Sequence, residues 1–406
     1  MSAKDFTRRK FLVHSSFLGC SLAASPLITP ISLASTPSDH RLVVIILRGG
    51  LDGLDVVGPF ENKEYSTLRP SLLPQPSSAI PLNGMFFMHP DLLALQPLWE
   101  AGELGFAHAV STPYRDKRSH FDGQDVLEAG MVNSDGQMFR DGWLNRLLQH
   151  MPKSHAQTAF TVGRYEMLLA KGEAEISNWA PDTRLDLTEQ AKRLLEISYQ
   201  NDPLFRNNLA EAIALTSPMA AISESLDPLE AMQKVAKEAR NLSGYENIAA
   251  FAAARLLEET RIASFSINGW DTHRNQKGAL KRALRNLSDV ILRLKNDLGP
   301  IWEKTAIVAM TEFGRTAHEN GTKGTDHGTG GLSILVGGAL KGKQVYGDWP
   351  GLREQDLYQG RDLTPTQDVR AYAAMAIRGM FGTNVETLEK HIFPGLDLSG
   401  ATQIIR

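Results

Sequence analysis

Acidic and histidine side chains gather in one glycine-rich stretch of the chain, Thr305 to Gly331. The stretch opens with an apolar run, Ala306 to Met310, which is typical of a buried strand. The polar loop that follows carries Glu312, Asp326 and His327. Carboxylates and imidazoles so close together indicate a metal site. A loop of this kind, directly after a buried strand, is where an open α/β sheet places its chemistry.

Three other polar loops also follow predicted strands. Asp52 follows the first strand, and Asp271 and His273 follow a later one. The loop after the second strand is basic, and its candidate residues are Arg115, Arg118, Ser119 and His120. Because parallel strands release their loops at one edge of a sheet, we expect these side chains to converge. Such a set suits Zn²⁺ or Mn²⁺, and without cysteine Ca²⁺ and Mg²⁺ are also compatible.

Each candidate also has a structural interpretation. Asp52 precedes Gly53 and reads as an ordinary turn aspartate, while Asp271 could cap a helix with His273 at the surface. Ser119 is most simply the cap of a helix that runs through residue 129. The same position has a functional alternative, since a hydroxyl at a helix N-terminus among basic neighbours favours a developing anion.

The elements that must position these residues alternate between strands and helices. Apolar runs predict strands at 41–47, 104–110, 158–162, 263–267, 306–310 and 332–336. Amphipathic patterns predict helices at 90–101, 120–129, 141–150 and 278–298, and a capping box at 364–367 predicts the start of a helix to 381. The order predicts a three-layer α/β/α sandwich with a mostly parallel sheet. Residues 186–261 have a helical pattern and are expected to form a helical insertion.

The N-terminus predicts export. Thr7 to Leu12 is a twin-arginine signal, and the small-residue pattern at 32–34 predicts removal of residues 1–34. Residues 35–406 would then form a single domain in the periplasm, delivered by the twin-arginine translocase. The one cysteine, Cys20, lies in the leader, so the exported chain has no disulfide and no thiol nucleophile. Phe17 does not fit a lipoprotein cleavage site, so we expect no lipid at Cys20.

Composition excludes several classes of partner. The 406 residues are 42 % hydrophobic and 22 % charged, with a net charge of −3, and loss of the basic leader makes the chain more acidic. We therefore expect no nucleic-acid partner. No apolar run beyond the leader is long enough to span a membrane. Gly49 to Gly53 lacks the glycine spacing of a dinucleotide loop, which disfavours a redox enzyme that binds NAD or FAD.

Together these motifs resemble a bacterial family known as domain of unknown function 1501, which is similar to the alkaline phosphatase and sulfatase superfamily. The resemblance covers nearly the whole exported chain. It is carried by the segments 47–54, 118–122, 270–273, 311–316 and 325–328. It implies an alkaline phosphatase-like fold, with metal ligands at Asp52, Asp271, His273, Glu312, Asp326 and His327. It also implies Ser119 as the nucleophile, with Thr112 as the second choice.

The chain departs from the superfamily pattern at one position. Where that pattern has Asp-His after a strand, this chain has Glu312 and Phe313, and phenylalanine cannot bind a metal. The resemblance implies a periplasmic metal-dependent hydrolase of anionic phosphate or sulfate esters, with Arg118 or Arg115 neutralising the ester oxygens and His120 beside them. Phe313 supports the alternative, a non-catalytic binding or assembly protein on the same fold.

Overall fold

The computed structural model describes residues 38–75, 78–132, 140–163, 166–179 and 244–406. The predicted leader at 1–34, with Cys20, lies outside these residues, and so does the predicted insertion as far as residue 243. The last part of that predicted helical region is a helix, α10 (Gly244–Leu257). Among the described residues, none of the helices is both long and apolar enough to cross a membrane.

A central sheet organises the described residues and has nine strands, in the order β11-β5-β10-β9-β1-β8-β6-β7 with β14 beside β5. The strands are β1 (Arg41–Arg48), β5 (Leu104–Ser111), β6 (Ala159–Val162), β7 (Ser177–Trp179), β8 (Ile262–Asn268), β9 (Thr305–Met310), β10 (Gly331–Val336), β11 (Val345–Tyr346) and β14 (Gln367–Asp368). Every pair is parallel except those that β10 makes with β5 and β9. The predicted mostly parallel sheet is therefore confirmed.

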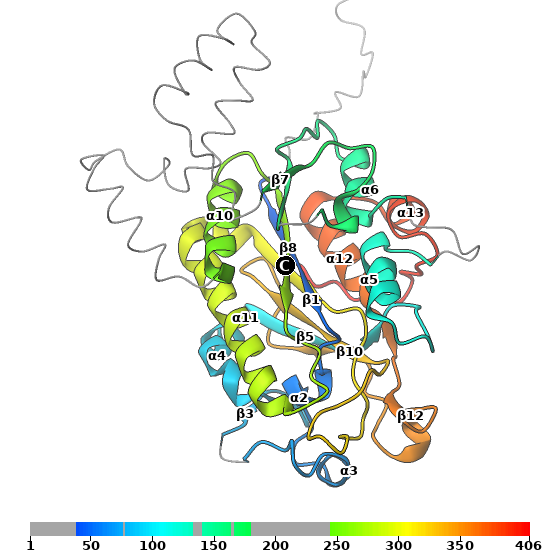
Figure 1. Cartoon of the computed structure of the whole chain (residues 1–406). Helices are drawn as coiled ribbons and strands as arrows, with labels where there is room; N and C mark the ends of the chain where they lie inside the picture. Colours follow the sequence, from blue (N-terminus) through cyan, green and yellow to red (C-terminus); the bar gives the residue numbers. More distant parts are fainter. Residues whose placement is uncertain (1–37, 76–77, 133–139, 164–165, 180–243) are drawn as a thin grey trace, which may run out of the picture. The chain divides into compact units, whose positions relative to one another are not determined.

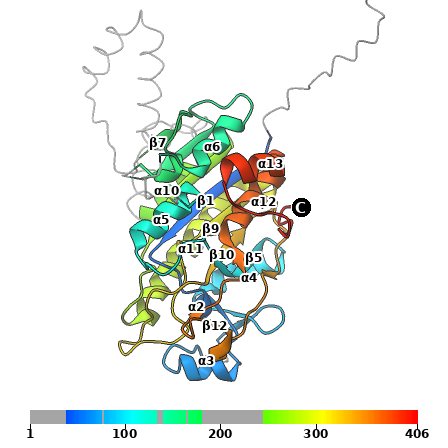
Figure 2. The ribbon, with the colours of Figure 1, turned by 90° about the vertical axis from the view of Figure 1, so that its right-hand side faces the viewer.

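Helices cover both faces of the sheet, as Figures 1 and 2 show. One face carries α10, α11 (Gln276–Leu298), a 3-10 helix at Pro90–Leu95 and α4 (Gln96–Glu100). The other carries α5 (His120–Ala129), α6 (Trp143–His150) and α12 (Val369–Phe381). The prediction of a three-layer α/β/α sandwich is confirmed.

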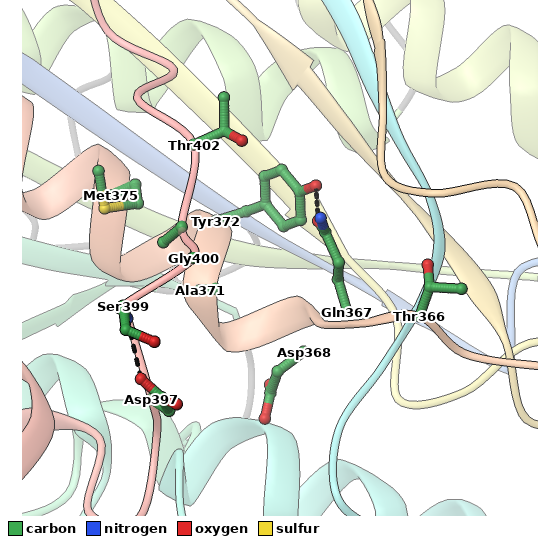
Figure 3. Close-up of a pocket in the computed structure, with 11 residues that line it drawn as sticks. Thr366, Gln367, Asp368, Ala371, Tyr372, Met375, Asp397, Ser399, Gly400 and Thr402 are labelled. Carbon is green, nitrogen blue, oxygen red and sulfur yellow. Dashed lines mark hydrogen bonds between the residues drawn. The ribbon is translucent and has the colours of Figure 1, made fainter.

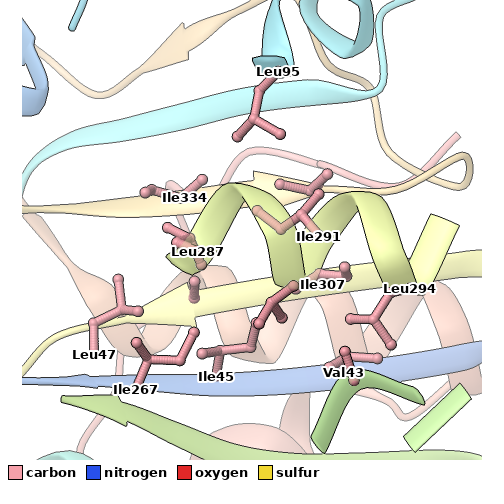
Figure 4. Packing of buried hydrophobic residues seen from close by; sticks show 14 of the residues in the cluster. Val43, Ile45, Leu47, Leu95, Ile267, Leu287, Ile291, Leu294, Ile307 and Ile334 are labelled. Carbon is pink, nitrogen blue, oxygen red and sulfur yellow. The ribbon is translucent and has the colours of Figure 1, made fainter. Parts of the chain in front are cut away.

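The central strand β1 shows why both faces must be covered. Val43, Ile45 and Leu47 point into one hydrophobic cluster, while alternate residues such as Val44 point into the other. In Figure 4, Leu287 and its neighbours on α11 pack against the β1 side chains of the first cluster. A strand buried on both faces reads as one continuous apolar run, which is why residues 41–47 were so apolar in sequence.

Smaller elements surround the sheet. A three-stranded sheet contains β2 (Val57–Gly58), β3 (Ile80–Pro81) and β4 (Phe87–Met88), and a hairpin contains β12 (Leu357–Tyr358) and β13 (Asp362–Leu363). Short helices are α2 (Gly53–Val56), α3 (Lys63–Leu68) and α13 (Val385–Thr387), with a π-helix at Leu388–Ile392 and 3-10 helices at Leu168–Ala170, Gly299–Lys304 and Glu354–Asp356.

Two predicted helices differ from the structure. The prediction that a helix starts at the capping box 364–367 was wrong, because Gln367 and Asp368 pair with β5 as a strand. Helix α12 therefore starts at Val369, and Asp368 caps it by accepting a hydrogen bond from the N–H of Arg370 at 2.9 Å. The predicted helix at 90–101 is divided into a 3-10 helix and α4, with Pro97 at the junction. Pro97 lacks an N–H to donate, so the junction loses one helical hydrogen bond.

The antiparallel strand β10 explains how its preceding loop reaches the site. Strands β1, β5, β8 and β9 run in one direction and end at the same edge of the sheet. Because β10 runs the opposite way, it begins at that edge, and Gly331 lies near the end of β9. The loops after the four parallel strands therefore meet at one edge, and the loop after β9 leads there directly into β10.

Candidate metal centre

Three histidines from three separate segments of the chain surround one carboxylate at this edge. The Nε2 atoms of His273 and His327 lie 3.0 and 3.4 Å from Oδ1 of Asp271, and Nε2 of His120 lies 3.5 Å from Oδ2. His120 begins α5, Asp271 and His273 follow β8, and His327 precedes β10. His120, Asp271 and His327 form a group whose ligand atoms all lie within 4.8 Å of one another. The structure thus brings together four of the residues singled out in the sequence.

The opposite ring nitrogen of each histidine is held by an oxygen. Nδ1 of His120 bonds Oε1 of Glu312 at 2.7 Å, and Nδ1 of His273 bonds Oδ1 of Asp326 at 3.0 Å. Nδ1 of His327 bonds the carbonyl oxygen of Arg118 at 2.8 Å. These oxygens carry no proton, so each Nδ1 donates its own, and each Nε2 is left facing Asp271. Metal-binding histidines are commonly oriented in this way by an oxygen behind the ring.

Glu312 is therefore a hydrogen-bond partner of His120, on the side of the ring away from Asp271. Its carboxylate is fully buried and also accepts hydrogen bonds from the backbone N–H of Gly49 at 2.9 Å and from Nε2 of Gln124 at 3.1 Å. Burial alone would raise the pKa of Glu312, but the hydrogen bonds from these donors and His120 lower it below its ordinary value. The same bond to Glu312 raises the pKa of His120 despite its partial burial. Glu312 is thus placed to orient His120.

The donor atoms fit a bound cation. Nε2 of His120 is buried and has no hydrogen-bond partner among the described residues. Nε2 of His273 and Nε2 of His327 are only 2.9 Å apart, so a proton or a cation must lie between their lone pairs. Burial lowers the pKa of His327, which favours the neutral imidazole that binds metals. Three imidazoles and one carboxylate make a set that Zn²⁺ commonly takes.

Glycines allow the loops that carry these residues to touch. A Cβ atom on Gly314 would lie 1.9 Å from the carbonyl oxygen of Gly330, and one on Gly328 would lie 2.3 Å from the carbonyl carbon of Arg315. The two ends of the single loop between β9 and β10 therefore pack backbone against backbone. Arg315 is fully buried beside them and donates to Oδ1 of Asp271 at 2.9 Å. Burial would raise the pKa of Asp271, and this hydrogen bond lowers it.

Asp52 does not join the histidines. Both of its oxygens accept from Nη1 of Arg69 at 2.9 Å, and Arg69 is fully buried. Arg69 also donates to the carbonyl oxygens of Ala317 at 2.9 Å and Thr316 at 2.6 Å. A guanidinium therefore already supplies the cation beside Asp52. In the structure, Asp52 joins the first loop to the loop after β9.

The candidate residues of the basic loop after β5 do not all lie beside the histidines. Ser119 is confirmed as the cap of α5, since its Oγ accepts from the N–H of Asp122. It also lies between Arg118, whose carbonyl binds His327, and His120. Arg115 points elsewhere, because its Nη1 donates to Oγ of Ser111 at 2.9 Å. Thr112, the second candidate nucleophile, is buried.

Some neighbours of the centre were not singled out as site residues from the sequence. They are Arg361, Asp362, Gln124 and Arg315. Arg361 donates to the carbonyl oxygen of His327 at 3.0 Å, and Arg315 binds Asp271. Arg315 lies within the motif after β9 and could have been found there. Arg361 stands outside every motif, so nothing in its sequence surroundings pointed to it.

A separate cavity of about 360 Å³ lies beside the start of α12 and is shown in Figure 3. Tyr372 hydrogen-bonds Gln367 there, and Asp397 accepts from the N–H of Ser399. The residues that line this cavity include no histidine and none of the residues around Asp271. We therefore place the chemistry at the histidine-rich edge of the sheet.

Fold and site together describe an α/β sandwich with a histidine-rich candidate metal centre at one sheet edge. The chain belongs to the family described as "Protein of unknown function (DUF1501)", whose model matches residues 101–382. No curated protein matches it.

Several solved structures are similar to this chain. The lipoteichoic acid synthase LtaP from Listeria monocytogenes is 10 % identical, with 89 % of this chain and 76 % of that one covered and a TM-score of 0.41. A protein in the alkaline phosphatase superfamily from Vibrio parahaemolyticus is also 10 % identical, with 85 % and 68 % covered and a TM-score of 0.38. A sulfatase from Pseudoalteromonas sp. is 13 % identical, with 99 % and 78 % covered and a TM-score of 0.37.

Proposed function

We propose that this protein is a periplasmic metal-dependent hydrolase of phosphate or sulfate esters, exported by the twin-arginine translocase. The observation that carries the proposal is the orientation of three histidines, each with Nδ1 bonded to an oxygen and Nε2 directed at Asp271. Such an arrangement leaves three Nε2 atoms facing one carboxylate, and those of His273 and His327 lie 2.9 Å apart. The bound metal would polarise the ester and neutralise charge on its oxygens.

The donor set favours Zn²⁺. His120, His273 and His327 offer nitrogen, whereas Ca²⁺ and Mg²⁺ prefer shells made of oxygen. Asp271 offers the oxygen of a mixed set, and its exposed fraction of 45 % leaves it open to solvent. Mn²⁺ accepts a mixed set of this kind too, so it is the second choice.

Ser119 is the proposed nucleophile. Its Oγ would attack phosphorus or sulfur, and the alcohol oxygen of the ester would leave with a proton. Water would then hydrolyse the ester formed on Ser119 and release phosphate or sulfate. Support comes from chain position, because Ser119 directly precedes His120 and caps α5, where the partial positive charge of the helix favours an anion.

The first test measures metal and turnover on the same preparation. We expect about one equivalent of zinc by elemental analysis, and we expect hydrolysis of aryl phosphates or aryl sulfates. His327→Ala should lose the metal, whereas His391→Ala should keep it, because His391 is exposed and stacks on His150, outside the centre. A wild-type protein that binds no zinc or manganese after loading would refute the proposal.

A second pair of variants tests the nucleophile. Ser119→Ala should abolish turnover and keep the metal. Asn62→Ala removes a comparable helix cap from α3 and should keep both, so it controls for the loss of a cap. Full activity in Ser119→Ala would remove Ser119 from the mechanism.

The alternative is a binding or assembly protein with the same metal centre. Phe313 is the observation that favours it, because its buried ring stands where the superfamily pattern has a further histidine. Stoichiometric metal without turnover of any phosphate or sulfate ester would support this alternative.

A further inference from the structure

Arg118 and Arg361 both make a hydrogen bond with His327 at the candidate metal centre. The carbonyl oxygen of Arg118 accepts from the ring of His327, and Nη1 of Arg361 donates to the backbone carbonyl of the same residue at 3.0 Å. The side chain of Arg118 is 37 % exposed and that of Arg361 is 33 % exposed. Both guanidinium groups are therefore within reach of solvent at the rim of the centre.

One buried carboxylate lies between the two guanidinium groups. Nη1 of Arg361 lies 2.7 Å from Oδ1 of Asp362, and Nη2 of Arg118 lies 3.9 Å from Oδ2. The carboxylate of Asp362 is only 1 % exposed and also accepts from the hydroxyl of Thr329 at 2.9 Å. One negative charge thus faces two positive charges, and this group of three carries a net positive charge.

The arginines keep donors available for a ligand. The side-chain hydrogen bonds of Arg361 to the described residues all use Nη1, so its Nε and Nη2 donate to none of them. The side chain of Arg118 makes no hydrogen bond within the described residues either, since 3.9 Å is too long for one. Planar guanidinium groups with open N–H donors suit the paired oxygens of phosphate and sulfate.

Backbone strain at Arg118 is a second, independent observation. Its φ is +52°, in the left-handed region that a side chain with a Cβ atom rarely adopts. Such conformations cost about 1–3 kcal/mol and concentrate at functional sites. Here the strained turn directs the carbonyl of Arg118 to His327 while the side chain reaches toward Asp362.

We propose that Arg118 and Arg361, held by Asp362, form an oxyanion clamp that binds the charged group of the substrate beside His327. The inference rests on the proposed function for the identity of the substrate, and it adds Arg361 and Asp362 to the site. It restricts the substrates to esters with at least two non-bridging oxygens that share negative charge on one phosphorus or sulfur, as in phosphate mono- and diesters and sulfate monoesters, because each guanidinium needs one such oxygen to bind.

The test measures binding of inorganic phosphate by isothermal titration calorimetry, on zinc-loaded and on zinc-free protein. We expect Arg361→Gln to weaken phosphate binding at least tenfold in both forms. Arg361→Lys, which keeps the charge and loses the fork, should fall between this variant and the wild type. Arg353→Gln is the matched control, because Arg353 is exposed near the same hairpin, pairs with Asp356 and should leave the affinity unchanged.

The outcomes separate the clamp from the proposed function. Equal phosphate affinity in wild type and Arg361→Gln, or no phosphate binding by the wild type, would overturn the clamp whatever the zinc content. Zinc content and thermal midpoint are measured on each variant, and we expect Arg361→Gln to match the wild type in zinc content and to unfold at a lower temperature, because the buried carboxylate of Asp362 loses its nearest cation. If the wild type binds no zinc but its phosphate affinity still depends on Arg361, the proposed function fails and the clamp stands.

Discussion

Asp55 is expected to make this protein less stable as the pH rises toward 7. The side chain is fully buried, and Nε2 of Gln276 donates to Oδ2 at 2.7 Å, while Oδ1 has no hydrogen-bond partner among the described residues. Burial, and then the charge of Asp52, raise the pKa of Asp55 from 3.8 to about 7. The charge of Arg69 and the hydrogen bond from Gln276 lower the pKa of Asp55 and offset this rise only in part.

The sign and the size follow from linkage. The folded state holds the proton of Asp55 more tightly than the unfolded state, so stability falls as the pH rises through the interval between the two pKa values. At about 1.4 kcal/mol per pH unit, the interval from 3.8 to about 7 corresponds to roughly 4 kcal/mol. About 2–3 kcal/mol of this loss falls between pH 5 and pH 8.

Asp55→Asn removes the charge at every pH and keeps an oxygen for Gln276. We expect the free energy of unfolding of this variant to exceed that of the wild type by an amount that grows by about 2–3 kcal/mol from pH 5 to pH 8. Urea unfolding followed by tryptophan fluorescence at each pH measures the difference.

Asp52→Asn provides the matched control at the same site. It leaves the buried charge of Arg69 without its partner and should destabilise the protein by about 3–5 kcal/mol. If Asp55→Asn destabilises the protein at pH 8 as much as Asp52→Asn does, Asp55 is ionised and needed, and the reasoning is refuted.

Two further predictions concern the metal centre and the core. Glu312→Gln should weaken zinc binding about 10- to 100-fold in a competition titration with a chelator, because it alters the acceptor behind His120. Glu319 is a carboxylate that accepts from the backbone N–H of Ser71, so Glu319→Gln is the control. Equal zinc affinities in Glu312→Gln and the wild type would mean that Glu312 does not orient His120. Leu287→Ala should cost about 2–5 kcal/mol of stability in urea unfolding, since this α11 side chain is fully buried against the sheet. Leu93→Ala, at 59 % exposed, should change stability by less than about 0.5 kcal/mol, and similar losses in the two variants would contradict the packing described.

Regular patterns in the sequence predicted most of the sheet and the place where its loops meet. Buried strands are continuous apolar runs, and Asp271, His273, Glu312 and His327 follow or precede such runs. The hydrogen-bond partners of each of these side chains could not be predicted, because they depend on contacts between segments that are distant in the sequence. Glu312 reads as a ligand in sequence, yet its oxygens face a histidine that lies 192 residues away along the chain.

Asp52 is a second residue whose partner could not be predicted from the sequence. Its place after the first strand suits a metal ligand, and the sequence offers no sign that Arg69 will reach it. Arg69 is placed by the turn after α3, where the carbonyl oxygens of Thr316 and Ala317 complete its hydrogen bonds. A charged side chain is buried only when it finds such partners, and they come here from a loop about 250 residues away along the chain.

Phe313 and His120 are best understood together. The ring of Phe313 stacks on His120 with centroids 5.0 Å apart and planes inclined by 26°. It fits because Gly50 and Gly123 lack side chains, and a Cβ on either would lie about 3 Å from the ring. The position that carries no metal ligand thus supports a histidine from α5 that can supply one. With His120 from α5 beside His273 and His327 from the strand-end loops, the candidate centre contains three imidazoles.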